Sequence, residues 1–156
     1  MAIDFSLSPD PGAIRAGVRT FVDDVIKPGE ARIDGPGPEG AGEPLEGRER
    51  LDVLIEMRRA ARAEGIWLPH MPEEWGGMGL GHVELAMVQA EAAKSYYGPW
   101  VFNCQAPDEG NMHTLLHWAT DDQKERYLRP LCEGRTWSCF AMTEPEVAGS
   151  DPTLIQ

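Results

Sequence analysis

Residues 9–28, PDPGAIRAGVRTFVDDVIKP, carry the clearest helical pattern of this 156-residue sequence. Asp10 is a good N-cap, and Pro11 suits the first helical position because its missing N–H would have no partner there. We expect the helix to end at Pro28. Apolar side chains recur at spacings of four and three, the period of a helix with one buried face: Ile14, Val18, Phe21, Val22 and Val25.

Four further segments favour helix and make an all-α fold the expectation: residues 48–64, 82–95, 108–119 and 120–132. The last begins with the capping box Thr120-Asp121-Asp122-Gln123 and ends at Gly134. The sequence therefore predicts a bundle of about five main helices.

The apolar periodicity also predicts which side chains point into the core of each later helix. The predicted inward sets, in chain order, are Leu51, Leu54, Ile55 and Ala61; Val83, Ala86, Met87 and Ala90; Met112, Leu115, Leu116 and Ala119; and Tyr127, Leu128 and Leu131.

Two regions between the predicted helices are rich in glycine and proline. Ten of the twenty residues from 28 to 47 are Gly or Pro, so this stretch buries little apolar surface against its ordering entropy. We expect a long mobile loop there, within one helical domain. Gly98-Pro99 is expected to break the chain before the helix over 108–119.

Residues 137–142 (WSCFAM) differ from the helical text, because large and small side chains alternate. This pattern predicts a β-strand that leaves the helical domain. The chain thus divides into a helical domain over 1–136 and the start of a β-domain over 137–156.

Composition excludes some classes of protein. The chain has 14 Lys and Arg against 26 Asp and Glu, a net charge of -12, which argues against binding the nucleic-acid backbone. No stretch approaches the roughly 20 apolar residues that span a bilayer, and the N-terminus lacks a signal-peptide pattern. Three cysteines without a close pair fit reduced thiols, so we expect a cytoplasmic protein.

The four histidines do not predict a metal site. His113 and His117 have the i, i+4 spacing of a metal-binding pair, but Glu109 is the only nearby side chain at ligand spacing. We expect both at the surface of a helix or in an interface. His70 and His82 have no partner that the sequence identifies, and no metal is expected.

The segment FAMTEPEVAGSD (140–151) joins the predicted strand to two turns. Backbone N–H groups at the end of a strand, two hydroxyls and a glycine would suit a flat polar heterocycle. Taken alone, such a segment is more often a plain surface turn.

In context, AMTEPEVAGSD (141–151) resembles the signature of the acyl-CoA dehydrogenase family. PEEWGGMGLGHVE (72–84) and TDDQKERYLRPLCEG (120–134) are similar to the loop before the family's third helix and to the helix leading into its flavin-binding strand. The likeness covers essentially the whole chain. The Met-Thr-Glu-Pro form looks most like the branch of long multidomain animal members and their bacterial relatives.

The resemblance implies FAD as cofactor and names residues for it. Phe140 and Met142 would lie with their backbone along the flavin ring, and Thr143 would donate its hydroxyl to the pyrimidine side. Gly149 and Ser150 would lie near the flavin and the acyl-CoA, with Ser150 also binding the substrate. Thr143 could otherwise be a plain hydroxyl at a turn.

The reaction implied is FAD-dependent oxidation of the α,β C–C bond of an acyl-CoA thioester, with electrons passing to an electron-transfer flavoprotein. The family's catalytic Glu would lie in a C-terminal helical domain beyond Gln156, so we expect no catalytic residue here and no activity from these residues alone. The complete protein would be a homodimer or homotetramer. The alternative is a non-catalytic helical module that binds a partner subunit through Trp137, Phe140 and Met142.

Overall fold

The structure is a computed structural model that describes residues 9–35, 43–147, 149, 151 and 153. Within this part every regular element is a helix, which confirms the all-α class. The elements are α1 (Pro9–Phe21), the π turn η1 (Val22–Ile26), α2 (Lys27–Asp34), α3 (Gly47–Ala63), the 3-10 turn η2 (Glu73–Trp75), α4 (His82–Ala92), α5 (Gly98–Val101), α6 (Asp108–Trp118), α7 (Asp121–Gln123), the π turn η3 (Lys124–Leu128) and α8 (Arg129–Cys132).

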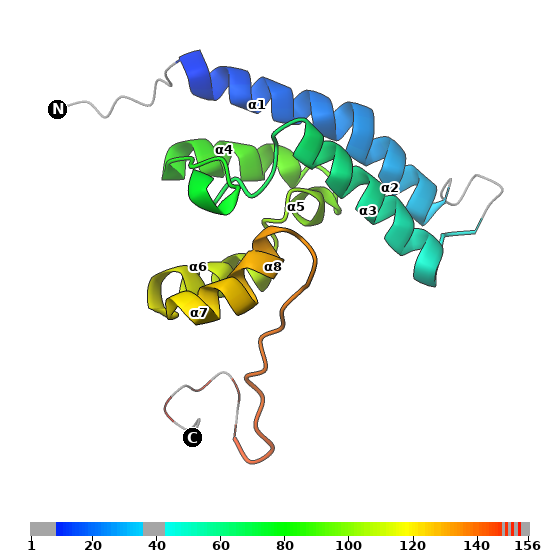
Figure 1. Cartoon of the computed structure of the whole chain (residues 1–156). Coiled ribbons are helices and arrows are strands. Elements are labelled where there is room, and N and C mark those ends of the chain that lie inside the picture. Colours follow the sequence, from blue (N-terminus) through cyan, green and yellow to red (C-terminus); the bar gives the residue numbers. More distant parts are fainter. Residues whose placement is uncertain (1–8, 36–42, 148, 150, 152, 154–156) are drawn as a thin grey trace.

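The helices form two groups (Figure 1). The continuous rod of α1 and α2 lies antiparallel to α3, with α4 and α5 packed against the pair. The run from α7 to α8 packs on α6 to form the second group. Beyond α8 the chain passes along α6 as far as Cys139 and then extends away from both groups, so residues 140–143 project from the helical body.

The first helix does not end at Pro28, and this prediction was wrong. A proline normally breaks a helix because it lacks an N–H and its ring clashes with the carbonyl four residues earlier. Here the π turn η1 comes first, in which the Lys27 N–H bonds to the Val22 carbonyl five residues back. The wider turn makes room for the ring. The π turn η3 precedes Pro130 in the same way.

The loop predicted over 28–47 is therefore shorter, because α2 occupies its first seven residues. Gly29 and Ile33 of α2 are buried against α3, and a Cβ on Gly29 would fall 2.2 Å from the Met57 sulfur. The Leu45 N–H donates to the Ile33 carbonyl at 2.7 Å and returns the chain to α3. Residues 36–42 lie outside the described residues.

Gly98-Pro99 does not break the chain but begins the short helix α5, with the proline in its first turn. The predicted capping box is confirmed: the Gln123 N–H donates to Thr120 Oγ1 at 3.3 Å, and the Thr120 N–H donates to Gln123 Oε1 at 2.9 Å. Local side-chain chemistry is thus a sound guide to where α7 begins, but it did not predict the start of α5.

Two of the predicted inward faces need correction. In α4, Val83, Ala86 and Ala90 are exposed, and the buried side chains are Val88, Glu91 and Ala92. Apolar residues occur on all sides of α4, so the apolar periodicity does not predict which face is buried. Ion pairs from Arg15 and Arg19 of α1 to Glu91 turn the Glu91 face of α4 inward. In α3, Leu51, Leu54 and Ile55 are half-buried and the core contains Val53, Met57, Arg58 and Ala61.

The other predicted faces agree better with the structure. Val18, Phe21 and Val22 are buried on the first rod. Met112, Leu128 and Leu131 are buried in the second group of helices, whereas Tyr127 is 48% exposed and does not point inward.

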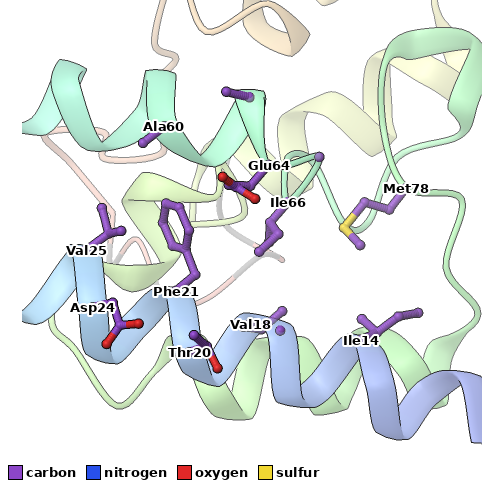
Figure 2. Close-up of a pocket in the computed structure, with 13 residues that line it drawn as sticks. Ile14, Val18, Thr20, Phe21, Asp24, Val25, Ala60, Glu64, Ile66 and Met78 are labelled. Atoms are coloured by element: carbon purple, nitrogen blue, oxygen red, sulfur yellow. The ribbon is translucent and has the colours of Figure 1, made fainter.

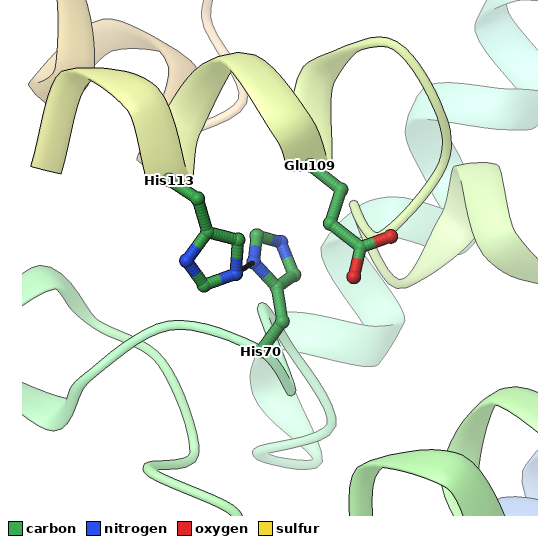
Figure 3. Close-up of side chains that lie close together, drawn as sticks. All are labelled: His70, Glu109 and His113. Atoms are coloured by element: carbon green, nitrogen blue, oxygen red, sulfur yellow. Dashed lines mark hydrogen bonds between the residues drawn. The ribbon is translucent and has the colours of Figure 1, made fainter. Parts of the chain in front are cut away.

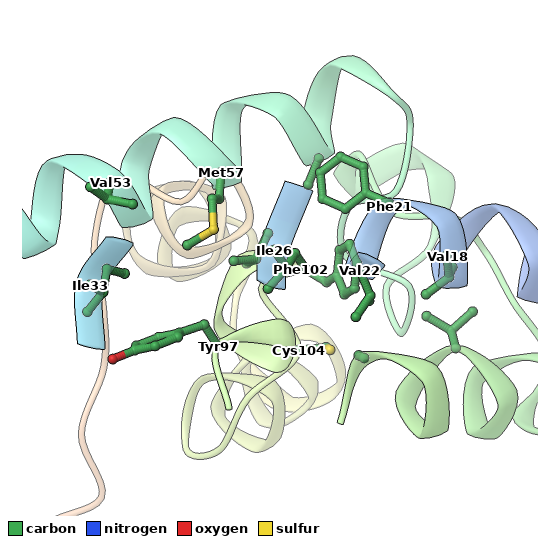
Figure 4. Packing of buried hydrophobic residues seen from close by; sticks show 14 residues of the cluster. Val18, Phe21, Val22, Ile26, Ile33, Val53, Met57, Tyr97, Phe102 and Cys104 are labelled. Carbon is green, nitrogen blue, oxygen red and sulfur yellow. The ribbon is translucent and has the colours of Figure 1, made fainter. Parts of the chain in front are cut away.

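Two apolar clusters hold the fold. The larger joins α1, η1, α2, α3, α4 and α5 around Phe21, Ile26 and Phe102 (Figure 4), where the Phe21 and Phe102 rings are 5.6 Å apart. The smaller packs Leu68 and Met71, from the loop after α3, against Met112 of α6, Leu128 of η3 and Leu131 of α8. That loop therefore links the two groups of helices.

The predicted strand is not formed among the described residues. Residues 136–144 are neither helix nor strand. A strand exists only through hydrogen bonds to a neighbouring strand, and the described part of the chain offers none. No helix in the described ranges has both the length and the apolar character needed to cross a membrane.

Candidate functional site

The segment that follows α8 is fixed at its start by α6. Asp108, 1% exposed, accepts hydrogen bonds from the Ser138 N–H at 2.7 Å and from the Ser138 hydroxyl at 2.5 Å. Asn111 donates to Ser138 Oγ at 2.8 Å and to the Cys139 carbonyl at 3.3 Å. Two polar side chains of α6 thus set where residues 140–143 begin.

The predicted flavin-contacting residues lie exposed on this segment. Phe140 is 70% exposed, Met142 is 40% exposed and Thr143 is also exposed. Trp137 precedes them at 48% exposure. Large apolar side chains on an extended segment without a partner are typical of a surface that another molecule or domain covers.

The turn after Thr143 folds back toward it. A Cβ built on Gly149 would lie 3.9 Å from the Thr143 Cα, so these two predicted site residues are neighbours. Ser150 lies outside the described residues, and its predicted contacts with cofactor and substrate stay predictions. The structure thus brings together Thr143 and Gly149 of the predicted set.

A cavity of about 500 Å³ lies beside the segment. Its walls come from α6, η3, α8 and residues 136–139, and Arg126 supplies a cationic group. The sequence analysis did not identify Asp108, Asn111 or Arg126. An Asp beside Pro107 has the character of an ordinary helix start, and no pattern shows that it contacts Ser138, 30 residues later.

A second polar cluster joins α6 to the loop that precedes η2 (Figure 3). His70 Nδ1 and His113 Nε2 are 3.2 Å apart, and the Glu109 carboxylate lies on the same side. Burial lowers the pKa of His70 to about 4, which keeps the imidazole neutral at pH 7. The sequence analysis found no partner for His70, because the two histidines are 43 residues apart.

A groove of about 760 Å³ runs between α1 and α3 at the far side of the molecule from residues 137–143 (Figures 1 and 2). Its walls are mainly apolar, with Ile14, Phe21 and Ile66 facing it. Asp24 and Glu64 are its charged members, and no cluster of reactive groups faces it. We assign it no chemistry.

Comparison with known proteins identifies the family. The sequence model of the acyl-CoA dehydrogenase N-terminal domain matches residues 8–135. The chain belongs to the acyl-CoA dehydrogenase family. This agrees with the resemblance carried by residues 72–84, 120–134 and 141–151.

Individual relatives agree with this assignment. The chain is 43% identical to human "Acyl-CoA dehydrogenase family member 11" over 104 residues, which cover 67% of this chain and 13% of that protein. It is 30% identical to "Probable acyl-CoA dehydrogenase FadE2" of Mycobacterium tuberculosis over 158 residues, 99% of this chain and 37% of the relative.

A solved structure confirms the fold. "Structure of a putative acyl-CoA dehydrogenase from Mycobacterium abscessus" superimposes with a TM-score of 0.82 at 37% identity, over 96% of this chain and 38% of that one. The matched part of the chain therefore covers between 13% and 38% of the length of these relatives.

Acyl-CoA dehydrogenases generally use FAD, and the residues present fit that group. Thr143 is exposed and its hydroxyl can donate, and the exposed apolar side chains of Phe140 and Met142 precede it on the same segment. Among the described residues, no backbone N–H of 140–143 donates to another backbone group. The backbone N–H groups of residues 140–143 and the apolar side chains of this segment are thus both available to contact a flat heterocycle.

Proposed function

We propose that this chain is the N-terminal helical part of an FAD-dependent enzyme that oxidises the α,β C–C bond of an acyl-CoA thioester. The observation that carries the proposal is the exposed strip from Phe140 to Thr143, anchored on α6 through Asp108. The helical domain would comprise residues 1–136, and residues 137–156 would open the β-domain that completes the flavin site.

Each residue of the strip has a task in this proposal. The backbone of Phe140 and Met142 would lie along the flavin ring, and Thr143 would donate its hydroxyl to the pyrimidine side. Gly149, beside Thr143, would let the ligand approach the backbone, and Ser150 would bind both cofactor and substrate. Bound FAD would supply the acceptor for the hydride that leaves the β-carbon of the substrate.

The base that removes the α-proton would come from a part of the protein beyond these residues. We therefore expect the 156-residue polypeptide by itself to bind FAD weakly and to be inactive. Stoichiometric flavin in the purified polypeptide would contradict this expectation.

The proposal extends to partners and location. An electron-transfer flavoprotein would accept the electrons, and the complete protein would be a homodimer or homotetramer. The exposed apolar side of α4, which includes Val83 at 58% exposure, supports further contacts with other domains or subunits. The cysteines Cys104, Cys132 and Cys139 are unpaired, in keeping with the cytoplasm.

The test substitutes Thr143→Val in the full-length protein. A hydrogen bond to a charged acceptor contributes about 1.5–3 kcal/mol, so we expect acyl-CoA oxidation to slow by about 10- to 100-fold. Thr20→Val, an exposed threonine of α1, should leave the rate unchanged. An active full-length protein without flavin, or a Thr143→Val variant with the original rate, would refute the proposal.

A second candidate is a helical module that binds a partner subunit, favoured by the exposure of Trp137, Phe140 and Met142. Light scattering of the 156-residue polypeptide separates the two. Association that is lost on Phe140→Lys would favour the module. A monomer that is indifferent to this change would count against it.

A further inference from the structure

Three potential metal ligands converge between α6 and the loop before η2 (Figure 3). One ligand atom each from His70, Glu109 and His113 lie within 4.8 Å of one another. Glu109 and His113 are four residues apart on α6 and therefore share a face, which His70 meets from the loop. We propose that these three side chains form a Zn²⁺ site, a feature separate from the flavin chemistry proposed above.

The spacing of the two imidazoles matches zinc coordination. Two Zn–N bonds of about 2.0–2.1 Å at a tetrahedral angle place the nitrogens about 3.3 Å apart. His70 Nδ1 and His113 Nε2 are separated by 3.2 Å. Their ring centroids are 5.1 Å apart with planes tilted by 52°, so the rings meet through their nitrogen edges. Glu109 is half-buried beside them and completes a set of two imidazoles and one carboxylate.

Outer contacts hold the ligands in the orientation that a metal needs. His70 Nε2 lies 3.2 Å from the Asn103 carbonyl, so this nitrogen carries the hydrogen and Nδ1 presents its lone pair to the ion. Gln89 of α4 donates to Glu109 Oε1 at 3.2 Å. Histidine ligands typically donate their second N–H to a carbonyl or carboxylate in this way.

The proton balance is simple. Without an ion, His113 Nε2–H donates to His70 Nδ1, the one nitrogen of that ring left to accept. When Zn²⁺ binds, the His113 ring changes tautomer: the proton on its Nε2 is replaced by one on its Nδ1, and His113 Nε2 and His70 Nδ1 both coordinate the ion. Three protein ligands leave the fourth tetrahedral position to water.

A cavity leads to the proposed zinc site, and a second pair of histidines, His113 and His117, lies beside it. A cavity of about 380 Å³ is lined by His70, His82, Gln89, His113 and His117 and connects the imidazoles to solvent. His113 also lies beside His117, but those rings are nearly parallel, at 13° and 6.2 Å, and their nitrogens do not converge as those of His70 and His113 do. His117 and His82 therefore serve as controls within the same cavity.

The experiment titrates Zn²⁺ into the chelator-treated full-length protein by calorimetry, with elemental analysis after dialysis. We expect the unchanged protein to bind one Zn²⁺ per chain. Glu109→Gln and His113→Asn should each weaken zinc binding by at least about tenfold. His82→Asn and His117→Asn should bind as the unchanged protein does. Because Zn²⁺ would bind the folded state alone, its addition should also raise the melting temperature.

Three results would overturn the proposal. One is the absence of zinc binding by a folded protein. Another is binding that survives both Glu109→Gln and His113→Asn. The last is binding that disappears on His117→Asn but not on Glu109→Gln, which would mean that the exposed helical pair binds the ion. Both ligand variants change half-buried side chains, so circular dichroism is needed to check that each variant folds. Flavin content plays no part in these readouts.

Discussion

The Glu91 side chain is 1% exposed and contacts three cations. Arg15 Nε and Arg19 Nη2 each lie 2.7 Å from its Oε1, and Lys94 pairs with Oε2. Hydrogen bonds from Arg19, Lys94 and Arg15 hold the pKa of Glu91 far below its ordinary value. This carboxylate fixes the rotation of α4 against α1.

Because this pKa is depressed in the folded state, the stability from Glu91 is complete above its ordinary pKa of 4.5 and is lost as the pH falls below it. We expect Glu91→Gln to lower the free energy of unfolding at pH 7 and to reduce the further loss of that free energy between pH 7 and pH 4. Chemical denaturation at pH 7 and pH 4 measures both effects. Glu56→Gln, which breaks an exposed pair with Arg32, should change little.

Gly98 allows the closest backbone approach of α5 to α4. A Cβ at this position would fall 1.9 Å from the Ala92 carbonyl oxygen, which is a backbone atom and cannot turn away. We expect Gly98→Ala to reduce the free energy of unfolding by about 1–3 kcal/mol or more. Gly110→Ala on α6, where nothing lies within 4 Å, should be neutral or stabilising by up to about 1 kcal/mol. Urea denaturation of the two variants gives the comparison.

At the level of elements, α6 positions the segment that follows α8. The Asp108 carboxylate accepts hydrogen bonds from the buried Gln105 amide, at 2.6 Å, and from the Ser138 N–H and hydroxyl. Asp108→Ala would leave all three donors without this acceptor. The cost expected is about 1–3 kcal/mol of unfolding free energy, and hydrogen exchange of the Ser138 amide should accelerate. Asp122→Ala, an exposed change in α7, is the control. Unchanged exchange at Ser138 would mean that α6 does not hold the segment.

Elements also show how far the sequence predicts this fold. Helix existence and the capping box at Thr120 follow from local pattern and side-chain chemistry, and the structure agrees. Pro28 misleads because the π turn before it makes room for the proline ring, and the apolar pattern does not distinguish a π turn from an α-helical one. The buried face of α4 was predicted wrongly because apolar residues occur on all sides of this helix. The ion pairs of Glu91 with Arg15 and Arg19, far away in the sequence, decide which side is buried.

The candidate site divides in the same way. Residues 140–143 and Gly149 are contiguous enough for a motif to identify them. Asp108 and His70 act through contacts 30 and 43 residues away, and sequence spacing contains no record of them. The strand predicted over 137–142 depends on partner strands, which the described residues do not contain.

At the scale of the whole molecule, Asn103 ties the two groups of helices together. Its side chain is 1% exposed, accepts from Arg58 Nη2 of α3 at 3.0 Å and donates to the Leu131 carbonyl of α8 at 3.0 Å. Its own carbonyl faces His70 at 3.2 Å. Burial lowers the pKa of Arg58 to about 10, so the guanidinium remains charged at neutral pH and needs this acceptor.

Removing the Asn103 side chain should therefore loosen the contact between the groups. Asn103 has a φ of 57°, a conformation that glycine adopts without strain, so Asn103→Gly isolates the loss of the side-chain hydrogen bonds. We expect Asn103→Gly to lower the free energy of unfolding by about 1–3 kcal/mol for each buried group left unpaired. Asn103→Ala should lower it further, because Ala is strained at that φ. Calorimetric unfolding of both variants tests the order. Equal stability of Asn103→Gly and the unchanged protein would mean that the apolar contacts of Leu68 and Met71 alone join the two groups.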